Sequence, residues 1–276
     1  MRDYAFGFIG AGNMAEALLR GIFEAGLLDP AQCFLTNKSN DERLARLSRA
    51  WDLRTTRDKA RLLAESDIVI LAVKPHDMPT VLEEIAPHVG PRHLIISVAA
   101  GVSTGTIEGR LGAVPVVRVM PNTSTAVRAS ATAVAQGRHV DPRHLAIVRQ
   151  LFEAVGWVGV VPEPLLDVVT AVSGSGPAYV YALAEALVES GERAGLPRDL
   201  ALALVAQTVL GAGKMLTETG EGPTVLRDRV TSPGGTTKAG LEALEQGGLR
   251  AAVQAAVTRA THRARELRDA PARSRG

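Results

Sequence analysis

Cysteine is nearly absent from this sequence, since Cys33 is the single cysteine among 276 residues. One cysteine cannot form an intrachain disulfide, and it cannot make a thiolate metal site by itself. The 6 histidines follow no HExxH pattern and no paired Cys/His spacing. These absences exclude a disulfide scaffold and the familiar zinc motifs, and no metal is expected.

Long uninterrupted apolar runs are also missing. A transmembrane helix needs about 20 consecutive, mostly apolar residues, so no membrane-spanning segment is expected. The N-terminal stretch MRDYAFGFIG lacks the charged leader and apolar core of a secretory signal. Together with the unpaired cysteine, this favours a protein of the reducing cytoplasm.

Charge of one sign is not in excess. The 31 basic and 29 acidic residues are mixed along the chain and give a formal charge of +2. Nucleic-acid binding usually requires a basic face, which this distribution does not supply. The arginine-rich end, residues 262–276, is the remaining candidate, and a solvated, partly frayed tail is the favoured interpretation.

The first part of the chain, residues 1–162, alternates short β-branched runs with amphipathic segments. Continuous apolar runs such as DIVILAV suit strands that are covered on both faces, and strands alternating with helices predict parallel βαβ units. We therefore expect a doubly wound α/β domain. Strands are predicted at 4–10, 33–37, 67–73, 93–100, 114–120, 131–136 and 157–161, and helices at 14–25, 41–51, 78–85 and 142–155.

The second part, residues 163–276, is rich in alanine and leucine at helical spacing and predicts an all-α domain. The segment 197–219 is apolar over most of its circumference. Either it is the central helix of its own domain or it is buried in an obligate dimer, and both alternatives stay open. Helices are predicted at 165–172, 177–194, 197–219, 223–230, 237–246 and 249–267.

A glycine-rich turn with the form G-x-G-x-x-A occupies residues 10–15, directly after a predicted strand and before a predicted helix. In dinucleotide-binding proteins the first glycine allows a tight turn and the second lets a pyrophosphate approach the backbone. The helix N-terminus adds free N–H groups and a partial positive charge. This context favours a phosphate site over a merely tight corner.

The end of the second predicted strand indicates which dinucleotide is bound. An Asp or Glu there would bond the ribose hydroxyls of NAD and repel a 2′-phosphate. This strand instead ends in Asn37, Lys38 and Ser39, which favours NADPH, with NADH possible. LAVKP at 71–75 and SVAAG at 97–101 end two further strands, so Ala72, Val73 and Ala100 can pack on the nicotinamide side.

Two glycine-rich breaks interrupt the helical part, SGSGPAY at 173–179 and VTSPGGTTKAGLEAL at 230–244. In each, small hydroxyl residues and glycines precede a helix, which is how a small carboxylate can be held by N–H groups, hydroxyls and the helix dipole. Ser and Thr are also ordinary helix caps, so composition alone leaves both interpretations open.

The chain resembles the 1-pyrroline-5-carboxylate reductase family, whose members form proline. The resemblance rests on FGFIGAGNMAEAL, DIVILAVKPH, SVAAGV, VSGSGPAYVYAL and LRDRVTSPGGTTKAGLEALEQGGLRAAV, and it runs from about Phe6 to Leu267. It implies a Rossmann-like NAD(P)H domain, a helical dimerisation domain and a homodimer or a higher oligomer of dimers. It also implies an active site in which the cofactor meets helices of a partner subunit.

The resemblance implies roles for individual residues. The substrate carboxylate would be held at Ser232, Gly235, Thr236 and Thr237, with Thr237 also reaching the reacting nitrogen, and Glu163 would lie in the substrate region. Arg229 and Lys59 depart from the family pattern, which often has Asn near both positions. The cofactor would contact Ile9, Gly10, Ala11, Gly12, Asn13, Met14, Asn37, Lys38, Ser39, Ala72, Val73, Lys74, Pro75 and Ala100.

Hydride transfer to a cyclic imine needs a proton on the imine nitrogen, and that nitrogen is basic enough for solvent or a hydroxyl to manage the proton. A site of Ser, Thr and Gly is therefore sufficient, and catalysis would come mainly from positioning. Two alternatives remain. One is an NADP-dependent β-hydroxyacid dehydrogenase or general imine reductase, for which Lys214 is the candidate lysine; the other is a non-catalytic NADPH-binding regulator.

Overall fold

The computed structural model describes residue 1 and residues 3–269. The chain divides into two compact units, one comprising Met1–Ser175 with Arg259–Gly276, the other Gly176–Thr258. The predicted boundary after residue 162 differs from this division. Residues 163–175 remain with the first unit because Leu166 is buried against Ala133 and Ala135 of the sheet.

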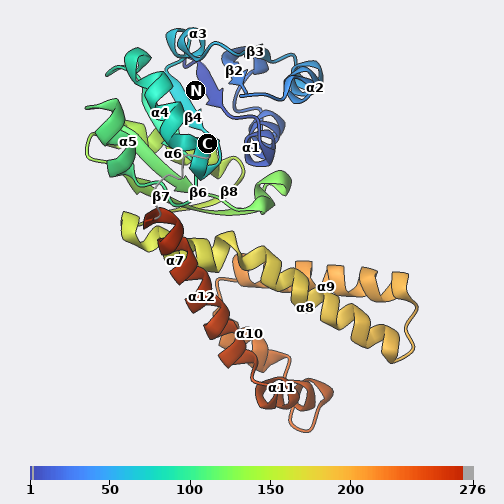
Figure 1. The fold of residues 1–276 in the computed structure, drawn as a ribbon. Helices are drawn as coiled ribbons and strands as arrows, with labels where there is room; N and C mark the ends of the chain where they lie inside the picture. Colours follow the sequence, from blue (N-terminus) through green and yellow to red (C-terminus); the bar gives the residue numbers. More distant parts are fainter. Residues whose placement is uncertain (2, 270–276) are drawn as a thin grey trace. The chain divides into compact units, whose positions relative to one another are not determined.

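The first unit is built on one eight-stranded sheet with the order β3-β2-β1-β4-β5-β6-β7-β8. Figure 1 shows this sheet with the helices that cover it. All neighbours are parallel except β6 and β7, which are antiparallel, so the expectation of parallel strands was wrong for that pair. A short connection through η4 (Thr123–Val127) joins these two strands, whereas a parallel pair needs a longer crossover. The strands are β1 (Phe6–Ile9), β2 (Cys33–Thr36), β3 (Arg54–Thr56), β4 (Ile68–Leu71), β5 (Leu94–Ser97), β6 (Val116–Met120), β7 (Ser130–Gln136) and β8 (Gly156–Val160).

Helices cover both faces of this sheet, as a doubly wound fold requires. Strand residues alternate between two buried clusters: Ile68 and Ile70 belong to the cluster with α1, α2 and α6, and Val69 and Leu71 to the cluster with α3, α4 and α5. The predicted α/β class is therefore confirmed. The helices are α1 (Asn13–Glu24), α2 (Asp41–Trp51), α3 (Lys59–Ala64), α4 (Met78–Ile85), α5 (Thr104–Leu111), α6 (Pro142–Glu153) and α7 (Leu166–Val169).

Three elements were not predicted from the sequence: β3, α3 and α5. The strand β3 has only Arg54, Thr55 and Thr56 and lies at the sheet edge, so it carries no apolar run. The helix α3 is short, and α5 contains Gly105 and Gly109, which lower helix propensity. Their stability comes from packing, which a local pattern does not reveal.

Cys33 lies in the core at 1% exposure. Burial raises the pKa of its thiol to about 12, and the nearby Asp29 carboxylate adds to the shift. Only the thiolate is a nucleophile, so we expect the folded protein to resist 5,5′-dithiobis(2-nitrobenzoate) at pH near 8, and the urea-unfolded chain to react fully. A rapid, stoichiometric reaction of the folded protein would contradict this placement.

The helical region is confirmed as predicted in type. It comprises α8 (Gly176–Arg193), α9 (Arg198–Glu218), α10 (Pro223–Arg229), α11 (Thr236–Gln246) and α12 (Leu249–Asp269). Helices α8 and α9 pack side by side (Figure 1). The expected frayed tail is helical through residue 269, and its remaining residues, 270–276, lie outside the described part of the chain.

Helix α9 is exposed over most of its surface in the single chain. Only Ala201 is buried, so the alternative of a central helix within its own domain was wrong. One 18-residue window of α9 has a mean hydropathy of 1.5, so this helix is long and apolar enough to cross a membrane by length and composition alone. No such segment was expected, because the prediction relied on uninterrupted apolar runs and α9 contains polar residues within its apolar sequence. The exposed large apolar residues of α9 are Leu200, Leu202, Leu204, Leu210, Met215 and Leu216.

Candidate cofactor and substrate sites

The glycine turn after β1 adopts the conformation that its sequence requires. Gly10 has φ +108°, and a Cβ there would lie 2.5 Å from the carbonyl oxygen of Ala72. A side chain is therefore excluded both by the backbone conformation and by the close approach of β4. The turn brings the chain across the carboxyl ends of β1 and β4, the edge where open α/β sheets bind ligands.

Gly12 is the N-cap of α1, and no side chain caps this helix. A Cβ at Gly12 would find open space, its nearest neighbour being the Ala72 carbonyl oxygen at 3.9 Å. The protein's own packing therefore does not explain the absence of a side chain. An uncapped helix N-terminus beside open space fits the pyrophosphate of a dinucleotide.

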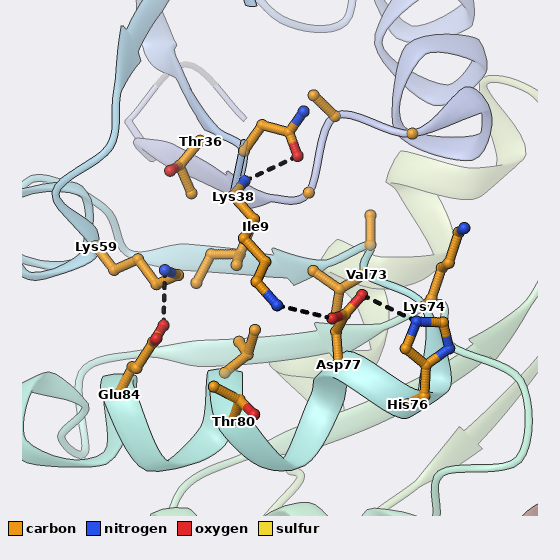
Figure 2. Close-up of a pocket in the computed structure, with 16 residues that line it drawn as sticks. Ile9, Thr36, Lys38, Lys59, Val73, Lys74, His76, Asp77, Thr80 and Glu84 are labelled. Atoms are coloured by element: carbon orange, nitrogen blue, oxygen red, sulfur yellow. Dashed lines mark hydrogen bonds and ion pairs between the residues drawn. The ribbon is translucent and has the colours of Figure 1, made fainter. Parts of the chain in front are cut away.

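A groove begins at this turn and follows the ends of β1, β2 and β4 (Figure 2). It is lined by Ile9, by residues that follow β4 and by residues of α4. Predicted cofactor residues that line it are Ile9, Gly10, Ala11, Gly12, Asn37, Lys38, Ala72, Val73 and Lys74. The other predicted ones, Asn13, Met14, Ser39, Pro75 and Ala100, are not among its lining residues.

Lys59 and His76, which the sequence placed near a phosphate and near the cofactor, also line the groove. The lining residues that the sequence did not indicate are Thr36, Asp77, Thr80, Val81 and Glu84. Thr36 ends β2 at 1% exposure, and its buried Oγ1 has no hydrogen-bond partner. A buried hydroxyl without a partner is unusual, so a ligand group in the groove is a natural partner for it. A strand pattern alone carries no signal for this role.

Two lysines that line the groove, Lys38 and Lys59, form ion pairs with carboxylates that line it too. The Lys38 ammonium lies 3.4 Å from a carboxylate oxygen of Asp77, and that of Lys59 lies 2.7 Å from Glu84, as Figure 2 shows. The end of β2 carries no carboxylate of its own. Lys38 is 74% exposed, so it is free to turn from Asp77 to a phosphate.

Arg43, from α2, forms hydrogen bonds to the glycine turn and to the start of α1. Its guanidinium donates to the Ala11 carbonyl oxygen, to Asn13 Oδ1 at 3.1 Å and to Glu16 Oε2 at 2.8 Å. Hydrogen bonding from Arg46, followed by the charges of Arg46 and Arg43, holds the pKa of Glu16 below its ordinary value against the opposing effect of burial. The turn is thus preorganised by a charged network.

The loop before α11, which was predicted to hold the substrate carboxylate, forms a glycine turn that leads into the helix. Gly234 adopts φ +71°, and Gly235 packs against the Ser232 side chain and donates its N–H to the Ser232 carbonyl oxygen at 3.0 Å. Gly235 is the N-cap of α11, with no side-chain cap. The first N–H groups of α11, which begins with Thr236 and Thr237, therefore have no side-chain cap.

Glu163 is engaged within the first unit. Its carboxylate accepts hydrogen bonds from the Thr104 backbone N–H at 2.8 Å and from the Thr104 hydroxyl at 2.7 Å, and Arg118 lies 3.4 Å away. Its predicted role in substrate binding stays a prediction.

Lys214, the candidate lysine of the alternative enzyme, is exposed on α9 and pairs with Glu218 at 3.9 Å.

No group of three or more His, Cys, Asp or Glu suited to a metal ion lies within the described residues. His76 lies at the groove rim, 3.5 Å from Asp77.

Comparisons with known proteins match both parts of the chain. Residues 5–101 match the family described as NADP oxidoreductase, coenzyme F420-dependent, and residues 163–267 match pyrroline-5-carboxylate reductase dimerisation. Pyrroline-5-carboxylate reductase 1 of Bacillus spizizenii is 43% identical, covering 95% of this chain and 89% of the relative. The second match indicates self-association of this chain through its helical part.

Solved structures agree over nearly the whole length. A pyrroline-5-carboxylate reductase from Coxiella burnetii has a TM-score of 0.90 and 40% identity, covering 97% of this chain and 99% of that one. The Plasmodium falciparum pyrroline carboxylate reductase, solved with NADP bound, has a TM-score of 0.86 and 31% identity, covering 98% and 100%. By this identity over this length, the chain belongs to the pyrroline-5-carboxylate reductase family.

Proposed function

We propose that this protein reduces 1-pyrroline-5-carboxylate to L-proline with NADPH, as an oxidoreductase acting on a CH–NH bond. The observation that carries the proposal is that two helix N-termini without a side-chain cap begin directly after glycine-rich turns. One follows the glycine turn, at α1, and the other follows the SPGG loop, at α11. Each suits one anion of the reaction: the cofactor pyrophosphate and the substrate carboxylate.

The groove residues would hold NADPH, which supplies the hydride. Gly12 leaves room for the pyrophosphate, and the α1 N–H groups bind it. Lys38 binds the 2′-phosphate after leaving Asp77, and Thr36 gains a partner for its buried hydroxyl. Ala72 and Val73 at the end of β4 provide an apolar surface against the nicotinamide side.

The loop residues would hold the substrate. The backbone N–H groups at the start of α11 and the Ser232 and Thr236 hydroxyls bind its carboxylate, and Thr237 hydrogen-bonds the ring nitrogen. The imine nitrogen is basic enough to carry the proton that makes its carbon electrophilic. The chain's contribution is therefore orientation rather than a strong acid, and orientation alone can supply several kcal/mol of the barrier reduction.

The test measures turnover by the purified protein with three classes of substrate. NADPH oxidation is followed with pyrroline-5-carboxylate and with an acyclic imine, and NADP reduction is followed with β-hydroxyacids. We expect activity with pyrroline-5-carboxylate to exceed the others. Activity with β-hydroxyacids instead would support a dehydrogenase, and NADPH binding without turnover would support a regulator.

Cofactor preference is expected to depend on Lys38. Lys38→Asp should raise KM for NADPH by about 10-fold or more and change KM for NADH little, because it replaces an attractive charge with a repulsive one. Arg149→Asp, the same kind of charge reversal at an exposed position on α6, is the matched control. Equal responses to the two cofactors would place the 2′-phosphate elsewhere.

We propose that a second copy of the chain covers the exposed apolar surface of α9, which includes Leu204 and Leu210. The match to a dimerisation family supports this occupant. Light scattering at micromolar concentration should give a dimer or a multiple of it, without detergent. A fully active monomer, or a protein that stays in solution only with lipid or detergent, would refute the proposal. A cytoplasmic location remains a prediction.

A further inference from the structure

The loop 98–103, which joins β5 to α5, is held at its far end and at its middle through two carboxylates from one short segment. This segment consists of η5 (Glu163–Leu165) and the start of α7. We infer that Glu163 and Asp167 are positioning residues, which fix this loop so that Ala100 is presented to the nicotinamide side of the cofactor. The inference rests on the proposed function, since it explains how Ala100 is kept in position relative to the bound cofactor.

Glu163 holds the far end of the loop. Its two carboxylate oxygens accept hydrogen bonds from the backbone N–H and the hydroxyl of Thr104, at 2.8 and 2.7 Å. Thr104 is the first residue of α5, so the negative charge also lies where the helix dipole favours it. The loop therefore cannot move at this end unless both hydrogen bonds break.

Arg118 supports Glu163 from inside the sheet. Its side chain is 2% exposed, and one guanidinium nitrogen lies 3.4 Å from the Glu163 carboxylate. The other terminal nitrogen, Nη2, is buried without a hydrogen-bond partner. Glu163 is thus the counter-charge for a buried cation, so neutralising it leaves that charge uncompensated.

Asp167 holds the middle of the loop through α12. Its side chain is 2% exposed and forms an ion pair with Arg268. The backbone of Leu267 and Arg268 lies directly against Gly101, where a Cβ would come within 3.4 Å of Leu267 C and 3.3 Å of Arg268 N. Gly101 also has φ +73°. The end of α12 is thereby pressed against the residue that follows Ala100.

The near end of the loop is fixed by the sheet itself. The Val98 N–H donates to the Leu71 carbonyl oxygen at 3.1 Å, so the loop starts beside the residues that lead into Ala72 and Val73. These residues line the cofactor groove. A shift of loop 98–103 would therefore change how the ends of β4 and β5 jointly meet the nicotinamide.

The spacing of the two carboxylates explains how one segment serves both contacts. Glu163 and Asp167 are four residues apart, in η5 and α7, so one short segment carries both carboxylates. One reaches α5 and the other reaches α12. A direct role of Glu163 as a substrate ligand makes different predictions, which the experiment separates.

The experiment compares Glu163→Gln, Asp167→Asn and Arg268→Gln in the full-length protein. Controls are Glu153→Gln and Arg263→Gln, which remove exposed charges from α6 and α12. We expect the three test variants to raise the NADPH dissociation constant and lower kcat by about 10-fold each, because small misplacements of reacting groups carry large rate costs. KM for pyrroline-5-carboxylate should stay within about 2-fold, since the substrate loop is untouched.

Hydrogen exchange of the peptide spanning 98–104 supplies a readout that does not need turnover. It should accelerate in all three test variants and stay unchanged in both controls. A conservative change, Arg268→Lys, keeps the charge and should restore much of the slow exchange. Hydrogen exchange can be measured even if the protein does not reduce pyrroline-5-carboxylate. Failure of the proposed function can therefore be distinguished from failure of this inference.

A second pair of variants tests the contact at Gly101 without removing any charge. Gly101→Ala places a methyl group against α12 and forces an unfavourable φ, so it should reproduce the faster loop exchange and weaker NADPH binding. Gly105→Ala, whose added Cβ would have only Ser103 Oγ at 3.9 Å, should change neither. The inference is overturned if Glu163→Gln raises substrate KM alone, or if loop exchange stays at the wild-type rate in every variant.

Discussion

Replacing Gly12 with valine is expected to lower NADPH affinity by about 100-fold, because the new side chain displaces phosphate oxygens from charge-assisted hydrogen bonds worth about 1.5–3 kcal/mol each. The fold should tolerate the change. A Cβ at Gly12 would meet only the Ala72 carbonyl oxygen, at 3.9 Å, so the first added carbon has room. Fluorescence titration with NADPH measures the loss of affinity.

Thermal unfolding of the same variant supplies the control. Valine is a poor N-cap, so the free energy of unfolding should fall by only about 1 kcal/mol. Gly109→Ala, where nothing lies within 4 Å of the added Cβ, is the matched substitution and should bind NADPH normally. If the Gly12→Val protein keeps wild-type affinity, the pyrophosphate is not bound at this turn.

Removing the Thr237 hydroxyl is expected to lower kcat/KM for pyrroline-5-carboxylate by about 10- to 100-fold, since a hydrogen bond to a charged group contributes about 1.5–3 kcal/mol. Thr237 is in the first turn of α11, whose N-cap is Gly235 with no side-chain cap. Thr237→Ala therefore removes no cap, and neither stability nor NADPH affinity should change much. Steady-state kinetics with both substrates varied provide the measurement.

Two companion variants make this result specific. Thr237→Ser retains the hydroxyl and should recover most of the activity. Thr217→Ala removes an exposed hydroxyl that donates to the Gly213 carbonyl oxygen at 3.1 Å within α9, and it should be silent. Normal turnover of Thr237→Ala, or joint loss of NADPH and substrate binding, would mean that another hydroxyl makes the contact.

Much of the first unit could be predicted from local pattern, because strands buried on both faces read as continuous apolar runs. DIVILAV and LIIS gave β4 and β5 in the right order and type. The antiparallel β7 could not be predicted, since its direction depends on the short connection after β6 rather than on its own residues. Helix α9 could be recognised as apolar, but its exposure depends on how neighbouring helices pack.

Some residues of the candidate sites could be predicted from local sequence, and others could not. Gly10 and Gly12 could be identified because glycine has a known purpose after a strand and before a helix. Asp77 and Thr36 could not, because their relevance depends on the meeting of β2 with the segment after β4. The contacts of Glu163 with Thr104 and of Asp167 with Arg268 span 59 and 101 residues of sequence, so no spacing rule could find them.

The most direct test of the proposed activity is the fate of the transferred hydride. The purified protein would be given pyrroline-5-carboxylate and NADPH carrying deuterium at C4 of the nicotinamide, in separate reactions for each of the two faces. One of the labelled cofactors should yield proline with a single deuterium at C5, detected by mass spectrometry. Unlabelled proline from both cofactors, or no proline at all, would contradict hydride transfer by this protein.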